Sequence, residues 1–130
     1  MTRKSILALP LAVLAACSPD ICTQEVDNHQ SFEKILACGD AGTILSGAAV
    51  SCGVKACQGA LSACTSADQA SMQATATCQA ALLGAYTGGC SAPALQAFEE
   101  QVNGCYTKGG PISVTCGEKQ GSATLSCAGL

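Results

Sequence analysis

The sequence predicts a mainly α-helical domain: a small disulfide-stapled bundle of four or five short helices with a C-terminal β-hairpin. Apolar residues recur at intervals of three and four through most of the chain, which favours amphipathic helices. The chain has 11 cysteines in 130 residues, whereas residues 17–130 hold only 22 large apolar side chains beside 19 alanines. Because alanine buries little surface, we expect disulfides to supply much of the stability.

The first helix is expected to begin at Asp27, which precedes a glutamine by three residues as in a capping box. Phe32 and Leu36 follow at helical spacing, and Gly39 supplies a stop. The only histidine, His29, lies in the first turn. No other ligand residue stands at a recognisable spacing from it, so we expect this side chain to be exposed to solvent rather than part of a site.

Two shorter helices are expected next. The first begins at Asp40 or Thr43 and ends at Gly53, and the second runs from Val54 to Cys64. Glycine weakens a helix interior and favours its end, so Gly53 is expected to separate the two helices.

The following helix has the clearest start in the chain, because Ser66 and Gln69 stand at capping-box spacing. It is expected to reach about Tyr86, before a pair of glycines. Its core stripe is expected to comprise Met72, Ala76, Leu83 and Tyr86. Apolar stripes at this spacing usually pack in a core.

A further helix is expected to begin after Ser91, with Pro93 in its first turn, and to end at Gly104. One of its faces carries Leu95, Phe98, Val102 and Cys105. The adjacent Glu99 and Glu100 point about 100° apart on a helix. We therefore expect them to form a solvated face and not a catalytic acid–base pair.

The C-terminal segment changes pattern. Residues 112–116 and 123–127 alternate with a period of two, and Gly121-Ser122 between them suits a type II′ hairpin turn. In that register Cys116 stands opposite Cys127, at a separation that permits a disulfide. A longer loop gives a competing register, in which Cys116 aligns with Ala123. We predict a β-hairpin here and suggest the pair Cys116–Cys127.

The N-terminal segment has the features of an export signal. Two basic residues precede a short apolar run, which ends in Leu14-Ala15-Ala16-Cys17. This motif resembles the lipobox of bacterial lipoprotein precursors. The resemblance implies cleavage before Cys17 and a diacylglyceryl group on its sulfur, and Ser18 at the next position implies delivery to the outer membrane. Residues 1–16 would then be the signal peptide, residues 17–21 the lipid-anchored tether and residues 22–130 the cysteine-rich domain. Simple secretion is the alternative.

Cysteine parity agrees with this assignment, because setting Cys17 apart leaves an even number. The ten others are expected to form five disulfides: Cys22, Cys38, Cys52, Cys57, Cys64, Cys78, Cys90, Cys105, Cys116 and Cys127. No pair has the Cys-x-x-Cys spacing of zinc knuckles or redox centres. The nearest group for metal binding, Cys52, Cys57 and Cys64, has no histidine beside it.

Charge and composition narrow the functions that the chain could have. Residues 17–130 contain four lysines, no arginine and nine acidic residues, a net charge of −5. Nucleic-acid binding is therefore not expected, and neither are catalytic residues, metals or cofactors. We predict a non-enzymatic binding or structural module of the cell envelope, attached to the membrane through Cys17, with an envelope protein as candidate partner. The alternatives are a small apolar-ligand carrier, with its cavity between the helices of Met72–Tyr86 and Leu95–Val102, and a thiol- or metal-handling protein.

Overall fold

The computed structural model describes residues 20–39 and 45–127, and within these ranges the chain is mainly helical. The elements are α1 (Ile21–Leu36), α2 (Gly47–Ala60), the 3-10 turn η1 (Leu61–Ala63), α3 (Ser66–Ala85), α4 (Ala92–Gly109) and α5 (Val114–Ser126). The prediction of four or five helices is confirmed. Cys17, Asp40 and Thr43 lie outside the described residues.

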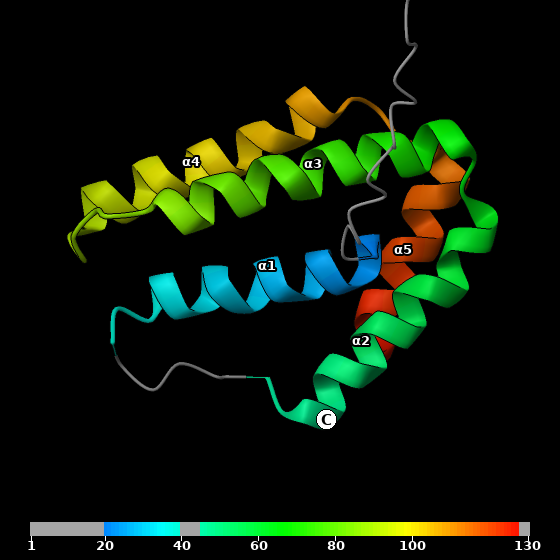
Figure 1. Ribbon diagram of the computed structural model, residues 1–130, viewed down its shortest axis with the longest axis horizontal. Coiled ribbons are helices and arrows are strands. Elements are labelled where there is room, and N and C mark those ends of the chain that lie inside the picture. Colours follow the sequence, from blue (N-terminus) through cyan, green and yellow to red (C-terminus); the bar gives the residue numbers. More distant parts are fainter. Residues whose placement is uncertain (1–19, 40–44, 128–130) are drawn as a thin grey trace, which may run out of the picture.

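Figure 1 shows two groups of helices. Helices α1, α3 and α4 lie side by side with α3 in the middle; α1 and α3 run in the same direction and α4 runs back. Helices α2 and α5 pack against each other and cross one end of this layer. A buried polar contact fixes α1 on α3, since Asn28 donates from Nδ2 to the carbonyl oxygen of Ala76 at 2.8 Å.

The sequence predicted that the first helix begins at Asp27, but α1 begins six residues earlier, at Ile21. Asp20 is the N-cap, because its Oδ1 accepts a hydrogen bond from the backbone N–H of Cys22 at 3.2 Å. The earlier start adds more than one turn to the helix and places Cys22 on it, so that this cysteine is fully buried.

Helix α2 continues through Gly53, so the predicted break into two helices is wrong. Its start at Gly47 is capped by Ser46, whose Oγ accepts from the N–H of Ala49. Gly53 has a packing role instead, because an added Cβ there would lie only 3.3 Å from Cγ2 of Val26 in α1.

Helix α3 starts with a capping box, but one residue earlier than predicted. Thr65 is the N-cap: its Oγ1 accepts from the N–H of Asp68, and Asp68 Oδ2 accepts from the N–H of Thr65 at 2.8 Å. Ser66 and Gln69 therefore do not form the box. The helix ends at Ala85 with Tyr86 as its C-cap, as predicted.

Helix α4 begins after Ser91 with proline in its first turn, as predicted, but it continues through Gly104 to Gly109. The last turn packs very closely on α3. A Cβ at Gly109 would overlap the hydroxyl of Thr75 and lie 2.8 Å from the carbonyl oxygen of Ser71. Gly110 follows with a φ of 93°, a conformation that favours glycine and ends the helix.

The C-terminal β-hairpin prediction is wrong, because Val114–Ser126 forms helix α5. Ser113 is its N-cap and accepts from the N–H of Cys116 at 3.3 Å. The suggested pair Cys116–Cys127 is also wrong, because these cysteines bond to Cys64 and Cys52. Cys116 and Cys127 are eleven residues apart, about three helical turns, so both can lie on one side of α5, which faces α2 and η1.

A buried carboxylate joins the start of α5 to the start of α3. Asp68 is 5% exposed, and its oxygens accept from the backbone N–H of Ser113 at 2.7 Å and from the hydroxyls of Ser113 and Thr65 at 2.9 Å. The N–H groups of Ser113 and Thr65 lower the pKa of Asp68 to about 2. Because every oxygen of this carboxylate has donors, its role is structural.

Five disulfides use all ten cysteines that the sequence analysis had assigned to the domain. They are Cys22–Cys57, Cys38–Cys90, Cys52–Cys127, Cys64–Cys116 and Cys78–Cys105. Together they join α1 to α2, α2 to α5, and α3 to α4, and they connect the end of α1 to the turn between α3 and α4. Every α-helix is therefore cross-linked to another part of the domain.

Cystines also form much of the core. Half of the buried apolar residues are half-cystines: the set is Cys22, Ala49, Cys57, Cys64, Met72, Ala76, Phe98, Val102, Cys105 and Cys116. Away from them, Phe98 packs against Tyr86 with ring centroids 4.3 Å apart and against Phe32 at 6.1 Å. The expectation that disulfides replace a large apolar core fits this arrangement.

Candidate functional site

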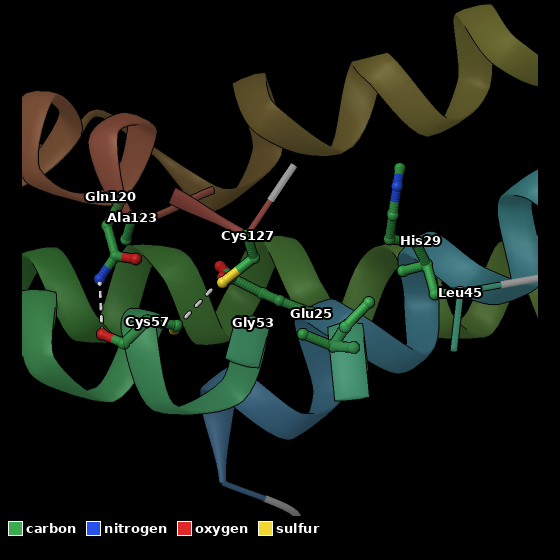
Figure 2. Close-up of a pocket in the computed structure, with 10 residues that line it drawn as sticks. Glu25, His29, Leu45, Gly53, Cys57, Gln120, Ala123 and Cys127 are labelled. Carbon is green, nitrogen blue, oxygen red and sulfur yellow. Dashed lines mark hydrogen bonds between the residues drawn. The ribbon is translucent and has the colours of Figure 1, made fainter. Parts of the chain in front are cut away.

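A cavity lies where α1, α2 and α5 meet, and we call it the Glu25 pocket (Figure 2). Its volume is about 350 Å³, within the usual range for small-molecule sites. It is lined by Glu25, Val26, His29, Leu45, Ala49, Gly53, Cys57, Gln120, Ala123 and Cys127. Most of these side chains are apolar, and Glu25 is the only acidic one.

The walls of the Glu25 pocket are covalently joined. Cys22–Cys57 links α1 to α2, and Cys52–Cys127 links α2 to the end of α5. Gln120 adds a polar contact across the α2–α5 boundary, since its Nε2 donates to the carbonyl oxygen of Cys57 at 3.4 Å. A pocket fixed in this way loses little conformational freedom when a ligand binds.

Glu25 extends from α1 towards Cys57, as Figure 2 shows, and its Oε2 lies 3.7 Å from the sulfur of Cys57. This sulfur belongs to a disulfide and has no proton to donate. Within residues 20–39 and 45–127, no N–H or O–H group donates to the carboxylate and no cation pairs with it. Burial raises the pKa of the Glu25 carboxyl above its ordinary value, and the negative charge of Asp20 raises it further.

A second cleft of about 370 Å³ adjoins the pocket along α1 and shares Glu25 and His29 with it. Its other walls come from α3 and α4, and it is more polar than the Glu25 pocket. Carboxylates of Glu33 and Glu99 line it, together with Phe32 and Tyr106. No lysine or arginine lines either cleft, so the field around Glu25 is negative.

Three side chains are exposed as predicted, although His29, which was not expected to belong to a site, lines both clefts. His29 is exposed, and it stands at the side of the Glu25 pocket with its ring pointing away from Cys57 (Figure 2). Glu99 and Glu100 are exposed.

The structure does not bring together the three cysteines that were the nearest metal group in the sequence. Cys52, Cys57 and Cys64 belong to three different disulfides. In the described part of the chain, no group of three or more histidine, cysteine or acidic side chains is arranged to hold a metal ion.

The helices of Met72–Tyr86 and Leu95–Val102, between which an apolar cavity was expected, form two walls of the 370 Å³ cleft. Those helices, α3 and α4, pack closely, and the cleft above them is partly polar. Sequence reasoning missed Glu25 altogether. Its spacing offered a sign, because Glu25 follows Cys22 by three residues and so shares a helix face with a cysteine that is bonded and buried.

No protein family, curated protein or solved structure gives a significant match to this chain. Among the helices that the structure describes, none combines the length and the apolar character needed to cross a bilayer.

Proposed function

We propose that the protein is a lipid-anchored, non-enzymatic binding module of the bacterial cell envelope that holds a small, largely apolar ligand in the Glu25 pocket. The observation that carries the proposal is an apolar cavity whose three helical walls are linked to one another by disulfides. Preformed apolar cavities with a few polar groups are the usual form of small-molecule sites.

The chemistry of the lining supports binding over catalysis. No residue that lines the Glu25 pocket carries a hydroxyl, an amine or a free thiol, and its sulfur atoms belong to disulfides. The lining that the structure describes therefore lacks hydroxyl, amine and thiol nucleophiles. All ten cysteines of the domain are bonded, which supports a binding role over thiol or metal handling.

The proposed anchor rests on the Leu14-Ala15-Ala16-Cys17 motif and on cysteine pairing. Cys17 is the one cysteine outside the five disulfides, as a lipid carrier would be. Four residue steps separate it from the start of α1 at Ile21, a reach of at most about 14 Å. The pocket would then lie close to the membrane surface, and Ser18 favours the outer membrane.

Mass spectrometry of the native protein tests the anchor. We expect an N-terminal peptide that begins at Cys17 and carries a diacylglyceryl group on sulfur. The Cys22 peptide, joined to Cys57, is the internal control for an unlipidated cysteine. An unmodified Cys17 would overturn the proposed lipid anchor, and simple secretion would then be the remaining interpretation of the signal.

Fluorescence of the uncharged apolar dye N-phenyl-1-naphthylamine tests the pocket. Ala123→Leu adds a larger side chain to the lining and should weaken dye binding at least tenfold. Ser122→Leu makes a similar change at the neighbouring exposed position of α5 and should leave binding within twofold. Equal binding by the two variants would place the dye outside the pocket and overturn the ligand-binding function.

A further inference from the structure

Glu25 is a partly buried carboxylate that receives no N–H or O–H hydrogen bond from the residues that the structure describes. Its side chain is only partly exposed and sits in a lining that is otherwise mostly apolar. The nearest partner atom is the disulfide sulfur of Cys57, which cannot donate a hydrogen bond. The contrast with Asp68 is sharp, because that buried carboxylate receives hydrogen bonds from both Thr65 and Ser113.

A partly buried carboxylate without donors loses part of its hydration on folding and gains no hydrogen bond in return. A ligand that places an N–H donor against the carboxylate would remove this cost. If the donor is also cationic, it gains a Coulomb attraction to the carboxylate that a neutral donor lacks.

We propose that the Glu25 pocket binds an amphiphile with an ammonium head, with the head on the Glu25 carboxylate and the apolar chain between α1, α2 and α5. This inference deepens the proposed ligand-binding function and rests on it. Different parts of the lining would contact the two parts of the ligand: the apolar walls of α2 and α5 would pack against the chain, and the Glu25 carboxylate would bind the ammonium head.

The charges around the pocket favour a cation over an anion or a neutral head. On α1, Asp20 and Glu33 flank the Glu25–His29 edge, and Glu99 of α4 faces the adjoining cleft. Helices α2 and α5 contribute no titratable side chain to the lining apart from bonded cysteines. An anionic head would meet only like charge here, whereas an alkylamine stays protonated at neutral pH because its pKa is about 10.

The cavity also limits the length of the chain. At about 30 Å³ for each water-sized group, a volume of about 350 Å³ accommodates on the order of twelve non-hydrogen atoms. Dodecylamine, with one nitrogen and a twelve-carbon chain, is therefore a suitable probe. Dodecanol and dodecanoate have the same number of carbons with a neutral and an anionic head.

Native mass spectrometry of the full chain, released from a neutral detergent, tests the proposal with these three probes. Dodecylamine should bind one to one and at least tenfold more tightly than either other probe. Glu25→Gln preserves shape and should weaken dodecylamine at least tenfold while leaving dodecanol within twofold. Asp27→Asn removes an exposed carboxylate from the other side of the same helix and should leave all three unchanged.

A second readout is pH. Dodecylamine binding should weaken as Glu25 becomes protonated in acid, whereas dodecanol binding should not follow that titration. A pH dependence of dodecylamine binding that persists in Glu25→Gln would overturn the role of Glu25.

The outcomes separate this inference from the function on which it rests. Equal binding of the three probes, insensitive to Glu25→Gln, would overturn the ammonium inference and keep an apolar-ligand pocket. Binding of none of them would overturn both. Binding of dodecylamine only after the acyl chains are removed from Cys17 would assign the pocket to the anchor of the protein and overturn the inference.

Discussion

Replacing Cys64 and Cys116 together with alanine tests whether disulfides hold α5 in place. The two cysteines are 52 residues apart in the chain, but a second bridge shortens the ring that they close. Cys52 lies twelve residues before Cys64, and Cys127 lies eleven residues after Cys116, so the ring through Cys52–Cys127 contains about 23 residues. For a ring of that size the chain-entropy relation gives about 3.4 kcal/mol.

Burial adds to this loss, since Cys116 is 0% exposed and packs with Met72 in the core. The double variant should therefore lose at least about 3 kcal/mol of unfolding free energy in a urea titration. Hydrogen exchange should show faster exchange for the amides of Val114–Ser126 than in the parent. That helix has two interior glycines, and its Val114 and Leu125 are about three-quarters exposed, so it has little apolar packing of its own.

The matched control removes Cys38–Cys90, which also spans 52 residues but ties α1 to the turn between α3 and α4. Its loss should lower the overall stability and leave the exchange of α5 amides unchanged. A loss below about 1 kcal/mol for the Cys64–Cys116 pair, or equal protection of α5 in both variants, would refute the reasoning.

Three further predictions concern packing and charge. Gly109→Ala should destabilise by about 1–3 kcal/mol in a urea titration, because the added Cβ has no room against α3. Asp68→Asn should remove an acid-dependent part of stability: with a pKa lowered to about 2 from 3.8, the wild-type carboxylate contributes above pH 3.8 and loses its contribution as pH falls towards about 2. Glu25→Gln should stabilise the ligand-free protein by about 1 kcal/mol at neutral pH, measured by urea titration, because ionisation of a group with a raised folded-state pKa disfavours the fold.

Each of these has a control or a contrary outcome. Gly104→Ala lies on the same helix with open space around the added Cβ, so it should not destabilise the protein; equal effects at both glycines would remove the packing argument. Parallel acid profiles for Asp68→Asn and wild type would show that Asp68 contributes nothing specific. The gain from Glu25→Gln should vanish below about pH 4.5, and a gain that persists there would assign it to something other than charge.

Helix type and several helix starts could be read from local sequence. The stripe of Met72 and Ala76 and the proline after Ser91 predicted α3 and α4, because these features depend on spacing within one segment. Helix starts were harder to predict from the sequence where two residues could each serve as the N-cap. Asp20 and Asp27 both fit an N-cap, and Asp20 is the one used, which makes Cys22 part of the helix.

The C-terminal segment shows where local pattern misleads. Its alternating residues favoured a hairpin, but alternation describes a strand only if one face becomes buried. In the fold Val114 is 76% exposed, whereas the less exposed positions Cys116, Gln120 and Ala123 fall at helical spacing. Cys116 packs with Met72 and Cys64, and Gln120 contacts α2. The N-cap residue Ser113 is also held by Asp68 of α3 through two hydrogen bonds, a contact that the local pattern does not reveal.

The sequence by itself indicated three properties of the domain. Its charge made the domain acidic, its cysteine count predicted five disulfides, and the spacing of its apolar residues predicted helices. Pairing and the pocket were decided only by the tertiary structure. Ten cysteines have many pairings, and the one adopted depends on which helix faces meet. Glu25 is likewise an ordinary surface glutamate in the sequence; it becomes a candidate ligand group because α2 and α5 close around it and bring no donor to its carboxylate.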